Sequence, residues 1–283
     1  MRLTPSEYRN LPNRRITLLG MSGVGKTHLS NMLRREDWFH YSGDYRIGTR
    51  YLSEPILDNI KAQAMQVPFL RALLRADSIQ IINNITVDNL HPVSSFLGKL
   101  GNPELGGLSL TEFKRRQALH HQAEVQAMLD VPDFIHKAQF LFGYPHFVND
   151  AGGSVSELES EEVLQTLARH TLILYIRATE EDQRQLIARA ERDPKPLYYR
   201  EVFLDEQLTR YMAERDLEYV AQIDPDDFVR WVFPLLFRAR LPRYEAIARD
   251  YGYTILSSEL AQIRDTSDFN ELVERALARG EAG

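Results

Sequence analysis

One short segment limits what this chain can fold into more than any other feature. Residues 20–27 match the pattern G-x-x-x-x-G-K-[ST], whose glycines let successive backbone N–H groups turn toward phosphate oxygens. The apolar run 15–19 before it is typical of a buried parallel strand, and Leu29 and Leu33 after it have helical spacing. A strand, a glycine-rich turn and a helix in this order predict a loop that binds phosphate at a helix N-terminus.

The end of this loop carries two polar residues with predicted roles. Lys26 is expected to bridge the β- and γ-phosphates of a nucleoside triphosphate, and the Thr27 hydroxyl to ligate Mg²⁺. A tight turn with a solvated lysine would need neither three glycines nor the Lys-Thr pair. The expected cofactors are therefore Mg²⁺ and ATP, which the motif does not distinguish from GTP. The predicted nucleotide-binding residues are Gly20, Met21, Ser22, Gly23, Val24, Gly25, Lys26, Thr27 and His28.

Composition excludes several other classes of function. The 283 residues hold 34 Lys and Arg against 40 Asp and Glu, a net charge of −6, which argues against a nucleic-acid partner. Cysteine is absent, so disulfides, thiolate nucleophiles and Cys-ligated metals are excluded. No apolar run approaches the roughly 20 residues of a membrane-spanning helix, and the N-terminal residues lack the apolar core of a signal peptide. We therefore expect a soluble, cytoplasmic protein with no membrane partner.

The rest of the chain alternates between strand-like and helical patterns. Helical signals fill most of 54–145, and Thr179 with Asp182 forms a capping pattern that begins another helix. A closing amphipathic helix is expected over 267–279. Strands separated by helices predict an α/β fold with a parallel sheet covered on both faces. The further strand-like runs are residues 146–149, 171–176 and 253–256.

Candidate site residues follow the strand-like run at 146–149. Asp150 ends that run, and we predict that it contributes to the Mg²⁺ site with Thr27; an aspartate that begins a turn is the alternative. Gly152 and Gly153 come next, and their lack of side chains would let a ligand approach the backbone closely. We predict substrate contacts for both glycines, with a flexible connector as the alternative.

A polar loop at 41–46 is expected at the sheet edge where α/β proteins bind their ligands. Asp44 could take a proton from an acceptor hydroxyl, or hold Mg²⁺ through water. Arg46 and Arg50 could bind a phosphate or carboxylate of the second substrate. A solvated loop in which Asp44 pairs with an arginine is the alternative.

Basic side chains follow the run at 171–176. Arg189 and Arg192 are three residues apart and share a helix face, so they could close over a transferring phosphoryl group and neutralise its charge. Arg184 and Lys195 belong to the same series. Acidic residues are interleaved with these cations, so a solvated face of ion pairs is an equally good interpretation.

Together these residues resemble a known family. The chain is similar to the kinase branch of the P-loop NTPases, most like shikimate kinase and its adenylate- and gluconate-kinase-like relatives. The resemblance implies a five-stranded parallel sheet in the order 2-3-1-4-5, a lid over the phosphates, and acceptor contacts from Asp44 with Arg46 or Arg50. It also places Ser257 and Ser258 beside the adenine. The segments that carry it are 20–27, 44–46, 152–153, the lid arginines 189 and 192, and 241–248, which resembles Arg-x-Pro-x-Tyr-x-x-x-Ala.

Two expansions set this chain apart from compact small-metabolite kinases. The stretch between the polar loop at 41–46 and the strand-like run at 146–149 is far longer than in those kinases, and the segment 200–240 after the lid is enlarged. These expansions would build a different acceptor pocket or a partner surface, so the acceptor stays unidentified. We expect a P-loop core of 1–53 and 146–283, a lid around 180–200 and a helical insertion of 54–145. The apolar patch 231–237 fits either a core or an interface, which leaves the oligomeric state open.

The sequence therefore predicts an ATP- and Mg²⁺-dependent phosphotransferase that acts on a hydroxyl group. Its predicted catalytic residues are Lys26, Asp44, Arg189 and Arg192. One alternative is a nucleotide-gated binding module that uses 54–145 as its recognition surface. Another is a kinase with a macromolecular acceptor. The cations that could serve that acceptor, scattered along an acidic chain, are Arg71, Arg75, Lys114, Arg115 and Arg116.

Overall fold

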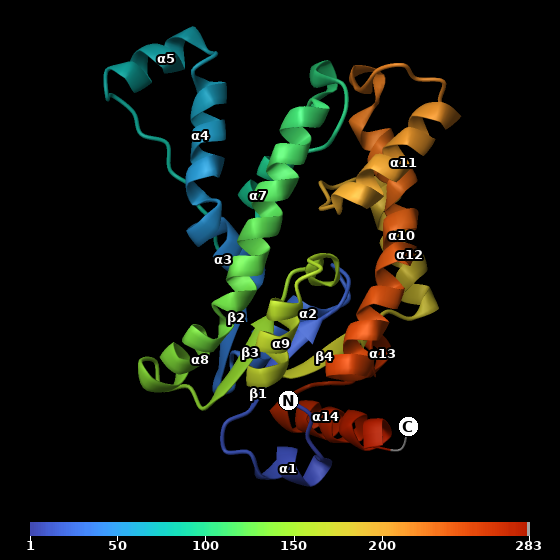
Figure 1. Ribbon diagram of the computed structural model, residues 1–283. Helices are drawn as coiled ribbons and strands as arrows, with labels where there is room; N and C mark the ends of the chain where they lie inside the picture. The colour runs from blue at the N-terminus through green and yellow to red at the C-terminus, as the bar shows by residue number, and fades with distance from the viewer. Residues whose placement is uncertain (282–283) are drawn as a thin grey trace. The chain divides into compact units, whose positions relative to one another are not determined.

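A five-stranded parallel sheet organises one part of the chain (Figure 1). The computed structural model describes residues 1–281. The strands are β1 (Arg15–Leu19), β2 (Trp38–Ser42), β3 (His146–Asp150), β4 (Leu172–Arg177) and β5 (Gly252–Leu256). They pair in parallel in the order β2-β3-β1-β4-β5. The predicted α/β fold and its strand order are confirmed.

The chain divides into two compact units. The first comprises Met1–Gly43, Glu124–Pro194 and the described chain from Arg230 onward, and it holds the whole sheet. The second comprises Asp44–Ala123 and Lys195–Val229. These limits differ from the expected core of 1–53 and 146–283 and the expected insertion of 54–145, because residues 44–53, 124–145 and 195–229 each group with the other unit.

Hydrogen bonds explain the two longer of these shifts, those of 124–145 and 195–229. The Tyr41 hydroxyl on β2 donates to the Ala127 carbonyl oxygen at 2.6 Å, which ties the end of the long helix α7 (Leu110–Leu129) to the sheet. Earlier on α7, the Gln117 side chain accepts from the Tyr199 backbone N–H at 2.9 Å and donates to the Leu197 carbonyl oxygen at 3.2 Å. The segment after Pro194 therefore belongs with the first part of α7.

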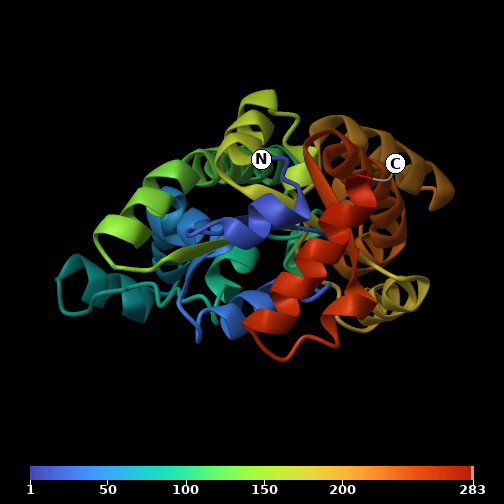
Figure 2. The ribbon, with the colours of Figure 1, turned by 90° about the horizontal axis from the view of Figure 1, so that it is seen from below.

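Helices cover both faces of the sheet. Trp38 and Phe39 are consecutive on β2, so their side chains point to opposite faces. The Trp38 ring packs edge-on against Phe269 of α14 (Thr266–Glu281), with 5.9 Å between ring centroids. The Phe39 ring lies 6.5 Å from Phe134 of α8 (Val131–Phe140). Figure 2 shows α14 and α8 on the two sides of the sheet.

The remaining helices of the first unit follow their sequence signals. Thr179 and Asp182 form the predicted capping box at the start of α10, each side chain accepting from the other residue's backbone N–H. The apolar patch predicted as core or interface lies on α12, and its Val232 and Leu236 are fully buried. In the described chain no helix has the length and apolarity to cross a bilayer. The remaining helices of the first unit are α1 (Pro5–Asn10), α2 (Lys26–Leu33), α9 (Glu161–His170), α10 (Glu180–Arg192), α13 (Ser257–Leu260) and most of α12 (Pro225–Tyr251).

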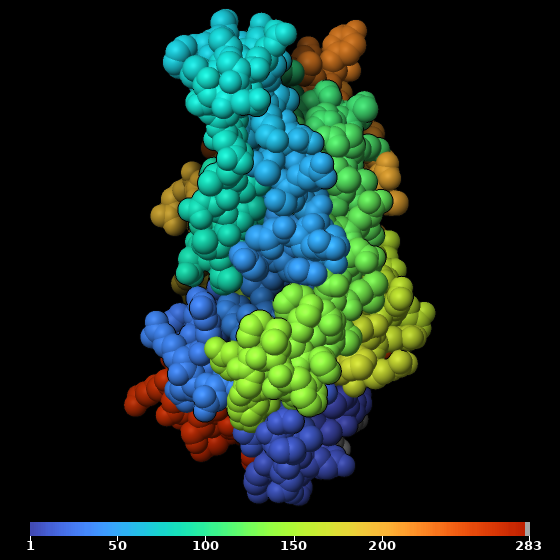
Figure 3. Space-filling model, turned by 90° about the vertical axis from the view of Figure 1, so that its left-hand side faces the viewer, coloured from blue at the N-terminus to red at the C-terminus, as the bar shows by residue number. Residues whose placement is uncertain are grey.

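The second unit is helical, and the buried Arg116 links three of its helices. Arg116 on α7 donates to the carbonyl oxygen of Phe96 at 2.6 Å, to Asn59 Oδ1 at 2.7 Å and to Glu112 Oε1 at 2.6 Å. These bonds tie α7 to α4 and α6, and Figure 3 shows α4 (blue) beside α7 (green). The helices of this unit are α3 (Gly43–Arg46), which begins at the last residue of the first unit, α4 (Ser53–Ala64), α5 (Pro68–Arg75), α6 (His91–Leu97), α7 up to residue 123, α11 (Glu201–Glu214) and the start of α12.

Candidate functional site

The glycine-rich segment forms the turn between β1 and α2, as predicted. Gly20, Gly23 and Gly25 have φ angles of 148°, 91° and 105°, in the region that favours glycine. A Cβ atom on Gly20 would lie 2.8 Å from the carbonyl oxygen of Ile176, and one on Gly23 would collide with the Arg189 guanidinium. The backbone conformation therefore favours glycine at all three positions, and at Gly20 a side chain would also clash with a backbone oxygen.

Lys26 is the first residue of α2 and is buried, with 6% of its surface exposed. Its Nζ donates to the carbonyl oxygens of Gly20 at 2.7 Å and Met21 at 3.1 Å. The ammonium group thus lies against the carbonyl oxygens of its own loop. A phosphate oxygen in the loop would compete for these protons with a full negative charge, which is the stronger acceptor.

The two residues predicted to hold Mg²⁺ lie together. Thr27 Oγ1 donates to Asp150 Oδ2 at 2.7 Å, and Asp150 ends β3 opposite Leu18 of β1. His40 Nε2 on β2 lies 3.6 Å from the same carboxylate oxygen. In the described residues no three acidic or histidine side chains cluster into a metal cage. Mg²⁺ needs no such cage, because one or two protein oxygens and the substrate phosphates suffice, so this hydroxyl–carboxylate pair fits the ion.

The Gly152-Gly153 pair packs against the phosphate loop. A Cβ atom on Gly153 would lie 3.0 Å from the backbone nitrogen of Ser22. The Gly153 carbonyl oxygen accepts from the Tyr244 hydroxyl at 2.9 Å and from Arg240 Nη1 at 3.1 Å, both on α12. Gly153 therefore lies between the loop and α12, where a side chain would crowd the Ser22 backbone.

The sequence left two interpretations for the arginines of α10, a solvated face of ion pairs or a site for the phosphoryl group, and these arginines differ in their surroundings. Arg184 is exposed and pairs with Glu181 at 2.7 Å, as in a solvated ion-pair face. The Arg189 guanidinium lies against Gly23 of the phosphate loop. Arg192 joins it in lining a pocket of about 380 Å³. Lys195 belongs to the second unit. The pocket is lined by Gly23, Asp182, Gln185, Leu186, Ala188, Arg189 and Arg192.

One wall of this pocket is a carboxylate fixed by hydroxyl groups. Asp182 accepts hydrogen bonds from Ser257 and from the hydroxyl and backbone N–H of Thr179. Burial raises the pKa of Asp182, but these hydrogen bonds outweigh it and lower the pKa below its ordinary value. Ser257 begins α13, and Leu260 of the same helix lies 3.7 Å from a Cβ atom built on Gly25. The segment predicted to border the adenine therefore lies beside the phosphate loop.

Sequence reasoning missed a buried polar cluster behind the glycine pair. Glu124 is fully buried and accepts from the Ser154 hydroxyl at 2.6 Å. Arg240 Nε lies 3.7 Å from a carboxylate oxygen of the buried Glu157. The signal available for Arg240 was its position directly before the 241–248 pattern, whereas Glu124 and Glu157 lie in sequences that resemble any solvated helix or turn.

The predicted acceptor residues begin the second unit. Asp44 follows Gly43, where a Cβ atom would lie 3.5 Å from the Gly152 backbone nitrogen. Arg46 ends α3, and its guanidinium lies 5.6 Å from the ring centre of Tyr51. Arg50 is exposed on a π-helix, residues 47–51, a rare element that is frequent at functional sites. Their roles toward an acceptor stay predictions.

Three of the five cations considered for a macromolecular acceptor pair with carboxylates of the protein. Lys114 pairs with Asp205 at 2.7 Å and with Glu201 at 3.1 Å. Arg115 pairs with Glu112 at 2.8 Å, and Arg116 is the buried arginine described above. These three side chains are therefore used within the second unit.

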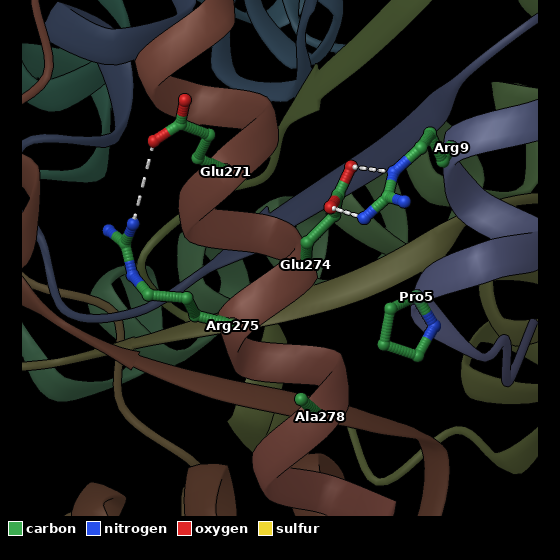
Figure 4. A pocket seen from close by; sticks show the side chains of 6 residues that line it. All are labelled: Pro5, Arg9, Glu271, Glu274, Arg275 and Ala278. Atoms are coloured by element: carbon green, nitrogen blue, oxygen red, sulfur yellow. Dashed lines mark hydrogen bonds and ion pairs between the residues drawn. The ribbon is translucent and has the colours of Figure 1, made fainter.

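A second pocket, of about 360 Å³, lies between α1 and α14 (Figure 4). Arg9 and Glu274 form a two-pronged ion pair across it, with N–O distances of 3.2 and 2.5 Å. Arg275 lies 3.9 Å from Glu271 on the same helix. The charged groups of this pocket pair with each other, and it contains none of the predicted site residues.

Comparisons with known proteins return structural similarity only. No protein-family model and no curated protein sequence matches the chain. The 1.7 Å crystal structure of shikimate kinase from Bacteroides thetaiotaomicron is 14% identical, with a TM-score of 0.40 over 95% of this chain and 98% of that chain. Shikimate kinase from Acinetobacter baumannii in complex with shikimate is also 14% identical, with a TM-score of 0.33 over 84% of this chain and 99% of that chain.

The fold itself follows from the chain's own geometry. Its sheet has the order β2-β3-β1-β4-β5, with every pairing parallel. A glycine-rich turn with three left-handed glycines joins the central strand β1 to α2. The chain therefore has a P-loop α/β fold.

Proposed function

We propose that this protein is an ATP- and Mg²⁺-dependent phosphotransferase that acts on a hydroxyl group of its acceptor. The observation that carries the proposal is the phosphate loop with its buried Lys26, next to the Thr27–Asp150 pair at the carboxyl end of the sheet. These residues supply an ammonium group, a hydroxyl and a carboxylate at one helix N-terminus, the arrangement that phosphoryl transfer requires.

The nucleotide side of the reaction is assigned to the first unit. Residues 20–28 bind the phosphates, with Lys26 on their terminal oxygens. Thr27 and Asp150 hold Mg²⁺, which when bound offsets the negative charge of the phosphates. Arg189 and Arg192 line the pocket beside Gly23, where their guanidinium groups stabilise charge on the transferring phosphoryl group. Most of the catalytic effect is then positioning and electrostatics.

The acceptor side is assigned to residues at the start of the second unit and to the glycine pair. Asp44 orients the acceptor hydroxyl and takes its proton. Arg46 and Arg50 bind an anionic group of the acceptor. Gly152 and Gly153 let the acceptor approach the backbone. The acceptor itself is a small or medium-sized molecule with a hydroxyl group.

The test is acceptor-dependent formation of ADP. Purified protein with Mg-ATP is screened against hydroxyl compounds that carry a carboxylate or phosphate, and each ADP signal is matched to a phosphorylated product. Asp44→Asn and Arg189→Ala should lower kcat about a hundredfold or more, whereas Arg184→Ala, on the exposed ion pair, should have no effect. Acceptor-dependent turnover that survives Asp44→Asn would remove Asp44 from its role.

A nucleotide-gated binding module is the second candidate. It is favoured by the division into two units, since the helical second unit contributes none of the phosphate-loop residues. This candidate predicts slow or absent hydrolysis with every acceptor and a partner affinity that depends on the bound nucleotide. The screen above separates the two, because a switch forms no phosphorylated product.

A further inference from the structure

The carbonyl oxygen of Gly20, at the start of the phosphate loop, receives two side-chain donors. Lys26 Nζ lies 2.7 Å from it, and the Tyr244 hydroxyl lies 3.3 Å from it. The same hydroxyl is closer to the Gly153 carbonyl oxygen, at 2.9 Å. A phenol carries one proton, so it donates to one carbonyl oxygen at a time. In this structure the shorter distances pair Lys26 with Gly20 and Tyr244 with Gly153.

Tyr244 is fixed in place and stays protonated. It is fully buried on α12, and its ring stacks on Tyr175 of β4 with 5.2 Å between centroids and 6° between planes. Burial raises the pKa of Tyr244 far above its ordinary value; the lowering by Arg240 and Ser156 is smaller. The hydroxyl is therefore a permanent donor with two acceptors in reach.

The two carbonyl oxygens differ in whether each keeps another donor when the Tyr244 hydroxyl donates elsewhere. Gly153 also accepts from Arg240 Nη1 at 3.1 Å, so its carbonyl oxygen keeps a donor without Tyr244. Gly20 depends on Lys26, the group that the proposed function assigns to a phosphate. A buried carbonyl oxygen that loses its donor destabilises the state in which this happens.

We propose that Tyr244 is a positioning residue whose hydroxyl proton turns from Gly153 to Gly20 when Lys26 leaves Gly20 for a phosphate. The move keeps the buried Gly20 carbonyl oxygen hydrogen-bonded and so makes Lys26 easier to release. It also removes one hydrogen bond from the Gly152-Gly153 pair at the moment the nucleotide is bound. Tyr244 thereby couples the phosphate loop to the glycine pair predicted to contact the acceptor. The inference rests on the proposed nucleotide site.

A double-mutant cycle in the absence of ligand tests the shared donor. In the wild type, Tyr244→Phe leaves Lys26 on Gly20 and Arg240 on Gly153, so the unfolding equilibrium changes little. In Lys26→Met the Tyr244 hydroxyl is the donor that remains for Gly20. There, Tyr244→Phe should raise the unfolding equilibrium constant about tenfold more than in the wild type, as measured by urea unfolding. Additive effects would overturn the proposal.

The matched control is Tyr175→Phe. Tyr175 is the stacking partner of Tyr244, and its hydroxyl has no hydrogen-bond partner among the described residues. The effects of Tyr175→Phe and Lys26→Met on the free energy of unfolding should therefore be additive. A coupling of the same size would show that the cycle reports general packing, which would also overturn the proposal.

Calorimetry with Mg-ADP gives the second measurement. Tyr244→Phe should weaken binding about tenfold, because Gly20 is left without a donor once Lys26 moves, whereas Tyr175→Phe should bind as the wild type does. Equal affinity of Tyr244→Phe and wild type would overturn the inference and leave the proposed function intact. Failure of the wild type to bind any Mg-nucleotide would instead refute the proposed function. The ligand-free cycle would still report on the shared donor.

Discussion

Lys26 and Arg116 are buried to the same degree, each 6% exposed, yet they serve different purposes in the two units. Arg116 donates to a carboxylate, an amide oxygen and a carbonyl oxygen that belong to three different helices or their ends. Lys26 donates to two neutral carbonyl oxygens of its own glycine-rich loop. A phosphate oxygen is a stronger acceptor than a backbone carbonyl oxygen, so it can take over the protons that Lys26 donates to its own loop. Burial alone therefore does not identify a binding cation; its partners do.

The sharpest test of this comparison is Lys26→Ala. Loss of the ammonium group should lower nucleotide turnover about a thousandfold or more, since it removes charge stabilisation of the transferring phosphoryl group. The protein should stay folded by circular dichroism. Lys137→Ala, which removes an exposed partner of Asp133, is the control and should turn over normally. Undiminished turnover by Lys26→Ala would refute the assignment.

The corresponding change in the second unit is Arg116→Ala. It should lower the free energy of unfolding by about 3 kcal/mol, because it leaves three buried or half-buried acceptors without their donor. Urea unfolding measures the change, and Mg-ADP affinity should stay within about twofold. Arg115→Ala removes a more exposed pair with the same glutamate and should lower the free energy by at most about 1 kcal/mol. The comparison fails if Arg116→Ala weakens nucleotide binding while stability is unchanged.

Asp150→Asn separates the metal site from the phosphate loop. The substitution keeps the size of the side chain but removes the charge beside Thr27, so affinity for Mg-ADP should fall about 10–100-fold. Titrations with EDTA in place of Mg²⁺ should give the same ADP affinity for variant and wild type. Thr27→Ser keeps the hydroxyl and is expected to bind nearly as the wild type does. Equal losses with and without Mg²⁺ would mean that Asp150 supports the loop and not the metal.

The smallest expected effect is an acid dependence of the second unit. Hydrogen bonds from Arg115 first, and from Arg116, lower the pKa of Glu112 to about 2 from its usual 4.5. Because the folded pKa lies below the unfolded one, the stabilisation is complete above pH 4.5 and is lost as the pH falls toward 2. The carboxylate is partly exposed, so we expect about 1 kcal/mol. Wild type and Glu112→Gln should converge in stability over this range, and a constant difference would contradict the assignment.

The phosphate loop could be predicted from the sequence because its chemistry is local. The three left-handed glycines, Lys26 and Thr27 occupy eight consecutive positions, so one turn between a strand and a helix fixes their arrangement. The contact between Thr27 and Asp150 was also predictable, because neighbouring parallel strands end at one edge of the sheet. The catalytic roles of these residues stay predictions.

The contacts that the sequence did not reveal join residues far apart along the chain. Arg184 and Arg189 look alike in the sequence, and the fold turns one toward Glu181 and the other toward Gly23. The unit boundaries shifted from the expected ones because Tyr41 and Tyr199 each bind a different half of α7. The spacing of residues along the chain cannot predict these contacts, since they depend on which helix faces pack together in the fold.

By itself, the sequence determined the position of the phosphate loop, the alternation of strands and helices, and the absence of thiol chemistry. These follow from residue order, because backbone conformation at glycines and hydrophobic periodicity are properties of short segments. Only the tertiary structure decided that the Tyr244 hydroxyl, 224 positions from Gly20, lies within reach of carbonyl oxygens in both the phosphate loop and the glycine pair. A hydroxyl acquires that role from the two carbonyl oxygens that packing brings within its reach.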